Sequence, residues 1–256
     1  MIESPSNPKL KRIRQLLDRS RARREEDAFV VEGLRSFREI PEDDIIEVFI
    51  SQSFRKDHPD IQGEIIKENI FNHLSDTQNP QGILAVVRQR HYTIEQIMRS
   101  SEGLLLILEG IQDPGNLGTM LRVGEGAGVS GILMDRNTAD IYSPKVVRST
   151  MGSIFRVPFL YSSDLPDLIL GLKEEGVRIY SSHPKAEQLY FEAEYPKKTA
   201  FLIGNEGRGL SDELSSLADE RISIPMMGKT ESLNAAISAA LLMYQYRTQR
   251  MKKRSV

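Results

Sequence analysis

The sequence contains no cysteine, which excludes disulfide bonds, thiolate nucleophiles and metal sites built on cysteine. It has only four histidines (His58, His73, His91 and His183), whose scattered spacing does not suggest a shared metal site. No apolar run approaches the roughly 20 residues that a membrane-spanning helix needs. The N-terminus is polar and basic, so we expect no signal peptide and no membrane partner. The lack of cysteine fits a reducing cytoplasm, where we expect the protein to act.

The sequence also has no net positive charge, since it carries a net charge of −2 over 256 residues. Any attraction to nucleic acid must therefore come from local patches. Residues 1–24 form one such patch, with eight cationic and two acidic side chains. A helix is expected to begin there at Asn7-Pro8, because the apolar residues that follow recur at helical spacing. The basic helix is either an ordinary solvated face or a surface that binds phosphate, and its composition favours neither reading.

The length predicts about two domains. We expect a first small α/β domain over residues 1–95 and a second domain over residues 103–256, joined by a polar linker. In the first, strands are predicted at 29–31, 45–50, 65–66 and 83–87, and helices at 33–40 and 67–74.

The second domain is expected to be built on a parallel sheet. Leu104–Leu108 is a continuous apolar run, as expected for a strand covered on both faces. Strands and helices then alternate, which is typical of parallel α/β proteins. Further strands are predicted at 132–134, 154–160, 177–181, 201–204 and 221–224. One predicted helix follows the first strand and ends at residue 127, and the others cover 144–151, 165–175 and the segment after 234.

Two apparent nucleotide-binding motifs are rejected. Gly126–Gly131 matches GxGxxG, but it closes a helix and precedes a strand, whereas a dinucleotide site needs the opposite order. Gly228-Lys-Thr230 resembles the end of a phosphate-binding P-loop. The glycine required five positions earlier is replaced by Ser223, and Pro225 removes a backbone amide that the phosphate cradle would use.

A set of polar residues remains at the predicted strand–helix turns. Asn116 and Arg122 lie six positions apart on one helix, Glu206 lies in a glycine-rich loop, and Ser232 and Asn234 precede the last helix. Singly, each has an ordinary structural explanation, such as a helix cap or a surface ion pair. Together, they indicate one polar cluster at the edge where α/β proteins bind ligands.

Three motifs carry a family resemblance. They read Asn116-x-Gly-x-x-x-Arg122, Ile203-Gly-x-Glu-Gly-x-Gly209 and Ile224-Pro-Met-x-Gly-x-x-x-Ser-Leu-Asn234. In residue type, order and spacing they resemble those of the SpoU/TrmH-type RNA ribose methyltransferases of the SPOUT superfamily. The resemblance covers about residues 104–250. Residues 1–90 are more weakly similar to the RNA-binding N-terminal domain of that family.

The resemblance implies a fold, a cofactor and partners. The parallel sheet would contain a deep trefoil knot, which chain patterning alone does not predict. The protein would form a homodimer and use S-adenosylmethionine, without a metal, to methylate a ribose 2′-hydroxyl in structured RNA. The alternative is an RNA-binding or ribosome assembly factor that keeps the fold without the activity, although the complete motif set argues against it.

The resemblance also implies roles for individual residues. Those assigned to catalysis are Arg122, Asn116, Glu206, Ser232 and Asn234, and those assigned to the cofactor are Gly204, Ile224, Leu233, Leu202 and Met226. Arg122 would act either as general base or by gripping phosphate and stabilising the developing alkoxide. The second role suits an arginine guanidinium, which normally stays charged. Arg148 and Arg208 are weaker candidates for phosphate contacts. Ribosomal RNA, of the large subunit, is favoured over transfer RNA.

Overall fold

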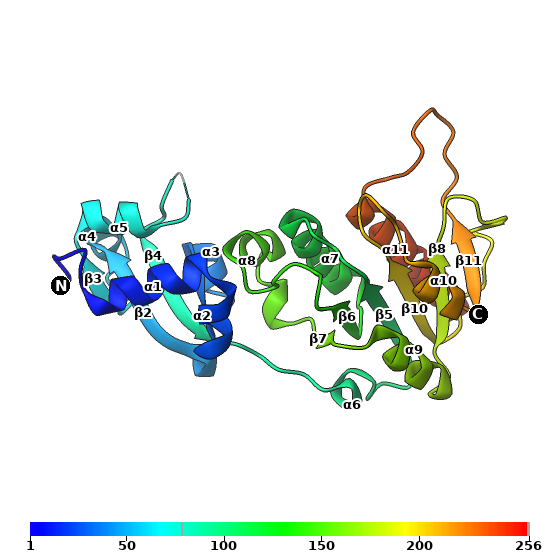
Figure 1. The fold of residues 1–256 in the computed structure, drawn as a ribbon. Helices are drawn as coiled ribbons and strands as arrows, with labels where there is room; N and C mark the ends of the chain where they lie inside the picture. Colours follow the sequence, from blue (N-terminus) through cyan, green and yellow to red (C-terminus); the bar gives the residue numbers. More distant parts are fainter. Residues whose placement is uncertain (78, 255–256) are drawn as a thin grey trace. The chain divides into compact units, whose positions relative to one another are not determined.

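The computed structural model describes residues 1–77 and 79–254, which divide into two compact units (Figure 1). Unit 1 comprises Met1–Arg90 together with Asp140–Phe155. Unit 2 comprises His91–Ala139 and the described chain from Arg156 onward. The domain limits expected from the sequence, 1–95 and 103–256, stay a prediction.

Unit 1 is built on a four-stranded mixed sheet with the order β1-β4-β2-β3. Strand β4 is antiparallel to both β1 and β2, and β3 is parallel to β2. All four predicted strands are confirmed. Their bounds are β1 Ala28–Glu32, β2 Ile45–Ser51, β3 Glu64–Ile66 and β4 Ile83–Arg88.

Helices cover this sheet because their apolar side chains need burial. The predicted N-terminal helix is confirmed as α1 (Pro8–Asp18), whose Asn7 cap accepts a hydrogen bond from the Lys9 amide. Its apolar stripe enters the main core of the unit with Phe71 of α5. The helix predicted over residues 33–40 is shorter, covering four residues as α3. The helices are α2 Ser20–Glu25, α3 Leu34–Phe37, α4 Gln52–Asp57, α5 Glu68–Leu74 and α8 Pro144–Thr150, with short 3-10 turns η1 Glu42–Asp44 and η2 Ser153–Phe155.

The strand predicted over 154–160 is wrong in its first half. Ile154 and Phe155 lie in η2 of unit 1, and β7 begins only at Phe159. The Phe155 carbonyl accepts a hydrogen bond from Arg90, and its ring lies 6.2 Å from that of Phe29. Tertiary burial therefore explains these apolar residues, and a short apolar run alone does not distinguish the two cases.

Unit 2 contains the predicted parallel sheet. Its seven strands have the order β7-β6-β5-β10-β8-β11-β9, and every adjacent pair is parallel. The two-residue strand β9 is not among the strands predicted from the sequence. The bounds are β5 Gly103–Leu108, β6 Gly131–Asp135, β7 Phe159–Ser162, β8 Arg178–Ser182, β9 Gln188–Leu189, β10 Lys198–Ile203 and β11 Glu220–Ser223.

Helices cover both faces of this sheet, as its continuous apolar strands require. On one face, α11 packs against α7, β10 and β5. On the other, side chains of α6, α9 and α10 form a core cluster with alternate residues of β5 and β10. The helices are α6 Ile94–Ile97, α7 Pro114–Ala127, α9 Leu165–Glu174, α10 Asp212–Leu217 and α11 Ala235–Arg254. Among the described residues, no helix is long and apolar enough to cross a membrane.

The middle of the sheet positions the sequence motifs. Strand β10, formed late in the chain, lies between β5 and β8 and is in register with β5, with Ile203 opposite Leu108. The two strands therefore end side by side, and each continues into a motif loop. Ligands of parallel α/β sheets bind at the carboxyl ends of strands where the strand order reverses.

Candidate functional site

The first two motifs are joined through the carboxylate of Glu206. Its Oε1 accepts hydrogen bonds from the Asp113 amide at 3.1 Å and from Nδ2 of Asn116 at 3.0 Å. Its Oε2 accepts one from the Gln112 amide at 3.2 Å. The loop after β10 is thus tied to the loop and first turn that follow β5.

The third motif joins the same network through Asn234. Its Nδ2 donates to Oδ1 of Asn116 at 2.9 Å, and its Oδ1 accepts from the amides of Ala236 at 2.9 Å and Ile237 at 3.3 Å. Asn234 therefore caps α11, a role that Ser232 does not take. The Asn116 amide has one orientation in this network, because an ionised carboxylate only accepts. We call Asn116, Glu206 and Asn234 the motif cluster.

The pKa of Glu206 reflects this environment. Burial alone would raise the pKa of this carboxyl. Hydrogen bonds from the Asn116 side chain and from main-chain amides, including those of Gln112 and Asp113, outweigh burial and lower the pKa below its ordinary value. Glu206 is therefore held as a carboxylate, the form that can accept all three hydrogen bonds.

Sequence reasoning missed Asn205, which shapes the loop after β10. Its Nδ2 donates to the Gly110 carbonyl at 2.7 Å, and its Oδ1 accepts from the amides of Gly207 and Arg208, each at 3.0 Å. Its backbone also pairs in both directions with Gly209. The available signal was an asparagine among glycines, which is typical of an Asx turn.

Arg122 and Ser232 lie outside the motif cluster. Six residues advance a helix by about 600°, so Arg122 lies roughly 120° around α7 from Asn116. Both Arg122 and Ser232 are exposed, and neither side chain makes a hydrogen bond or ion pair with another described residue. Glu206 is therefore hydrogen-bonded to Gln112, Asp113 and Asn116 and not to Arg122.

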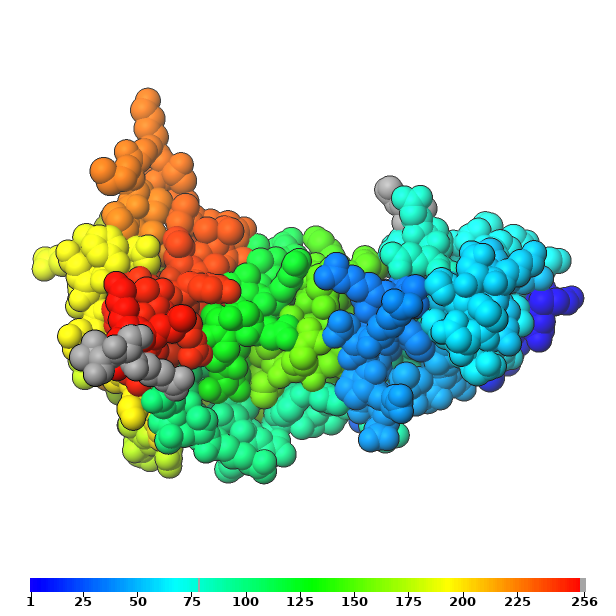
Figure 2. Space-filling view, turned by 180° about the vertical axis from the view of Figure 1, so that it is seen from behind, coloured from blue at the N-terminus to red at the C-terminus, as the bar shows by residue number. Residues whose placement is uncertain are grey.

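The residues assigned to the cofactor differ in accessibility. Leu202 is fully buried and packs with Leu214, so only its main chain is placed to reach a ligand. Ile224, Met226 and Leu233 are half-buried in the segment between β11 and α11. Figures 1 and 2 show that segment extending away from the rest of unit 2, and Met227 within it is 97% exposed.

The two weaker arginine candidates have different surroundings. Arg148 lies on α8 in unit 1, where its Nη1 is 2.8 Å from a carboxylate oxygen of Asp76. Arg208 is exposed in the loop after β10 and has no ion pair with a described residue. No group of histidine, aspartate and glutamate suited to a metal ion occurs in the part of the chain that the structure describes.

The backbone around Gly204 leaves no room for a side chain, which suggests a mutational test. A Cβ added there would lie 2.2 Å from the Gly209 carbonyl carbon and 2.2 Å from the Leu210 amide nitrogen. Because rigid backbone causes the clash, we expect Gly204→Ala to lower the free energy of unfolding by about 2–3 kcal/mol, measured by urea denaturation. Gly207→Ala is the control, since its nearest contact would be 3.6 Å. Equal stability of the two variants would contradict this account.

Comparison with known families identifies both parts of the chain. Residues 103–244 match the SpoU rRNA Methylase family, and residues 7–85 match the MRM3-like substrate binding domain. The chain is 32% identical over 251 residues to the 23S rRNA (guanosine(2553)-2′-O)-methyltransferase RlmP of Bacillus subtilis strain 168. That alignment covers 96% of this chain and 98% of the relative.

Solved structures agree along nearly the whole chain. The SpoU methyltransferase AviRb from Streptomyces viridochromogenes, in complex with the cofactor AdoMet, aligns with a TM-score of 0.84 and 25% identity, covering 96% of this chain and 98% of that one. The AdoMet-bound rRNA methyltransferase from Sinorhizobium meliloti aligns with a TM-score of 0.85 and 28% identity, covering 97% of each chain. The fold, the motif cluster and these similarities together place the chain in the SpoU rRNA methylase family, with an N-terminal substrate-binding domain.

Proposed function

We propose that this protein transfers a methyl group from S-adenosylmethionine to a ribose 2′-hydroxyl in structured RNA, with large-subunit ribosomal RNA as the favoured substrate. The observation that carries the proposal is the hydrogen-bonded motif cluster at the adjoining ends of β5 and β10. The cluster joins all three motifs at the edge of the sheet where α/β proteins bind ligands. The full-length similarity to an enzyme named for 23S ribosomal RNA supports the choice of substrate.

The proposed cofactor site suits S-adenosylmethionine. Half-buried Ile224, Met226 and Leu233 offer apolar surface for an adenine ring, whose polar edge would be met by main-chain groups of the motif loops. When bound, S-adenosylmethionine supplies a methyl group activated by the positive charge of its sulfonium. The protein's part is to align the ribose with that group, which is worth about 7–11 kcal/mol in favourable cases.

We propose that Arg122 holds the RNA phosphate next to the target ribose and stabilises the charge that develops on its oxygen. An exposed guanidinium without an internal partner can make two parallel hydrogen bonds to phosphate. It is a poor general base because arginine side chains rarely lose their proton. Asn116, Glu206 and Asn234 serve a different purpose in this scheme: they fix the loops that surround the reacting groups.

A homodimer is also proposed, on the evidence of one face of α11. Ile237, Tyr244 and Met251 are about half exposed or more, and they recur every seven residues, so they form one apolar stripe along the helix. The hydroxyl of Tyr244 lies over Gly126 of the neighbouring helix α7. Because glycine has no side chain, nothing at position 126 covers the Tyr244 ring. Exposed apolar stripes of this kind usually mark protein–protein contacts.

The dimer gives a direct prediction. We expect Tyr244→Glu to convert a dimer into a monomer of 29.0 kDa, because burying one charge per chain in an apolar interface is costly. Light scattering coupled to size exclusion would measure the mass. Leu170→Glu is the control, since Leu170 is 50% exposed but lies on α9, across the sheet from α11. A wild-type protein that is already monomeric at working concentration would exclude the dimer.

The trefoil knot and a cytoplasmic location complete the proposal. The insertion of β10 between β5 and β8, and of β11 between β8 and β9, supports a chain that threads between strands formed earlier. The absence of cysteine and the RNA substrate support the cytoplasm.

Mapping ribose methylation in total RNA from cells with and without the protein would test the proposed function. We expect one ribose methyl group to disappear from large-subunit ribosomal RNA when the protein is absent and to return with the wild-type gene. Loss of a methyl group from transfer RNA would replace the favoured substrate. An unchanged methylation map, with no methyl transfer by the purified protein, would favour an assembly factor instead.

A further inference from the structure

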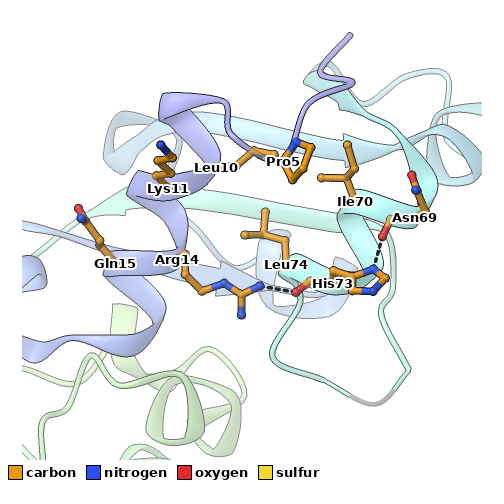
Figure 3. Close-up of a pocket in the computed structure, with 9 residues that line it drawn as sticks. All are labelled: Pro5, Leu10, Lys11, Arg14, Gln15, Asn69, Ile70, His73 and Leu74. Atoms are coloured by element: carbon orange, nitrogen blue, oxygen red, sulfur yellow. Dashed lines mark hydrogen bonds between the residues drawn. The ribbon is translucent and has the colours of Figure 1, made fainter.

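Unit 1 contains a groove of about 580 Å³ between α1 and α5, far from the motif cluster in sequence (Figure 3). Its floor is apolar, because the side chains of Leu10, Ile70 and Leu74 are buried beneath it. Its rim is polar and contains no carboxylate. The lining residues are Pro5, Leu10, Lys11, Arg14, Gln15, Asn69, Ile70, His73 and Leu74.

The cations of α1 divide into two sets with different surroundings. Lys9 lies 2.7 Å from a carboxylate oxygen of Glu64, and Arg12 lies 2.5 Å from one of Glu26. Glu47 lies within 3.7 Å of both cations. These charges are neutralised within the unit, so the basic segment identified in the sequence is not one uniform phosphate-binding face.

Lys11 and Arg14 form the other set and line the groove. Neither has an ion pair with a carboxylate among the described residues. Arg14 donates a hydrogen bond through Nη2 to the His73 carbonyl at the end of α5, which holds its guanidinium across the groove (Figure 3). The His73 ring is fixed in turn, with Nδ1 2.6 Å from the Asn69 carbonyl oxygen. In a protein of net charge −2, the groove is thus a local site of unbalanced positive charge.

We propose that this groove binds an unpaired nucleotide of the RNA substrate. An apolar floor suits the face of a base, a planar guanidinium or imidazole can stack on it, and the side-chain amides of Asn69 and Gln15 can read its edge. Lys11 and Arg14 match the adjacent phosphates. The volume falls within the range of about 300–1,000 Å³ that is usual for small-molecule sites. A paired base is excluded, because its faces are covered by its neighbours.

The inference rests on the proposed function, since it names how the same RNA is held. It also separates two tasks between the units: chemistry at the motif cluster and recognition of a looped or bulged nucleotide at the groove. An acidic protein segment is the competing occupant. It would satisfy Lys11 and Arg14 but would leave the apolar floor without a partner.

The first test compares two double variants of the full-length protein. Lys11→Ala/Arg14→Ala and Lys9→Ala/Arg12→Ala remove equal charge from the same helix. Initial rates of methyl transfer would be measured with total RNA from cells that lack the protein. We expect the first variant to raise KM for RNA about tenfold with kcat little changed, and the second to raise it less than about threefold. Equal increases, or no increase, would overturn the groove assignment. Lys11→Ala alone, which breaks no hydrogen bond between described residues, should still raise KM and so guards against misfolding.

The second test does not depend on methyl transfer. Fluorescence anisotropy would compare a labelled eight-nucleotide oligouridylate with a blunt RNA duplex of equal phosphate number, each with the wild type and both double variants. We expect the wild type to prefer the single strand, and Lys11→Ala/Arg14→Ala to lose that preference. If the wild type binds both RNAs equally, or if the groove variant keeps the preference, the groove is not a nucleotide site. If the wild type prefers the single strand but shows no methyl transfer, the proposed activity is refuted and the assignment of the groove as a nucleotide site stands.

Discussion

Arg122→Ala is expected to reduce kcat for methyl transfer about 10²–10³-fold, the usual loss when a group that stabilises developing charge is removed. The affinity for S-adenosylmethionine, measured by calorimetry, should stay within a few-fold. The structure explains why these two effects should separate. The Arg122 side chain is exposed and makes no hydrogen bond or ion pair with described residues, so its removal leaves the motif cluster intact. The melting temperature should therefore be unchanged.

Arg221→Ala is the matched control for this variant. Arg221 is an exposed arginine of unit 2 on β11, it also lacks an ion pair with described residues, and it has no proposed role in the reaction. Its variant should methylate RNA at the wild-type rate. Arg122→Lys should recover only part of the activity, because an ammonium cannot reproduce two parallel hydrogen bonds to phosphate. Normal turnover by Arg122→Ala would remove this residue from the mechanism.

Asn116 lies in the motif cluster and Arg122 lies outside it, and this difference indicates how far the sequence predicts the site. Motif spacing identified the polar residues, and the expected neighbours Asn116, Glu206 and Asn234 do lie in one hydrogen-bonded cluster. Spacing did not reveal which of them touch, because contacts between segments about 90 and 118 residues apart depend on the order of strands in the sheet. For the same reason, Asp113 and Gln112 could not be identified as partners of Glu206 through their main-chain amides.

The fold shows a similar division between local and long-range information. The continuous apolar run at Leu104–Leu108 correctly predicted a parallel strand with both faces buried. Ile154 and Phe155 were misassigned because both are buried in a 3-10 turn, where Phe155 contacts Phe29 and Arg90, which are distant in sequence. The β5–β10 pairing is likewise a long-range property, and no local pattern indicates that β10 enters the sheet between β5 and β8.

Among the residues of the motif cluster, Glu206 gives the sharpest prediction. Glu206→Gln keeps the size of the side chain but replaces one acceptor oxygen with a donor. Three N–H groups converge on this carboxylate, from Gln112, Asp113 and Asn116, and an amide can accept from only one side. At least one donor is left facing another donor, which costs about 1–2 kcal/mol at a partly solvated site. The new amide keeps most contacts when its oxygen takes the place of Oε1, so its NH2 group then faces the Gln112 amide and displaces the loop that leads to Asn116.

We therefore expect kcat/KM for RNA methylation to fall about 100-fold in Glu206→Gln, the effect expected when reacting groups are displaced by about 1 Å. Glu187→Gln, an exposed position in unit 2 without a partner among described residues, is the control with the same charge change and should behave as wild type. Wild-type kinetics in Glu206→Gln would show that the cluster does not position the reacting groups.

The pH dependence of the same contact provides an independent measurement. The pKa of Glu206 is lower in the folded protein than its ordinary value of 4.5, because its hydrogen bonds outweigh burial. A depressed carboxyl pKa gives stability that is fully present above the unfolded pKa and is lost as pH falls through the folded value. The carboxylate should therefore still hold Asn116 at pH 4.5 and release it only at lower pH. Carbon-13 NMR of the Glu206 carboxyl would follow this titration, and a midpoint at or above 4.5 would contradict the hydrogen-bonded geometry on which the proposed mechanism depends.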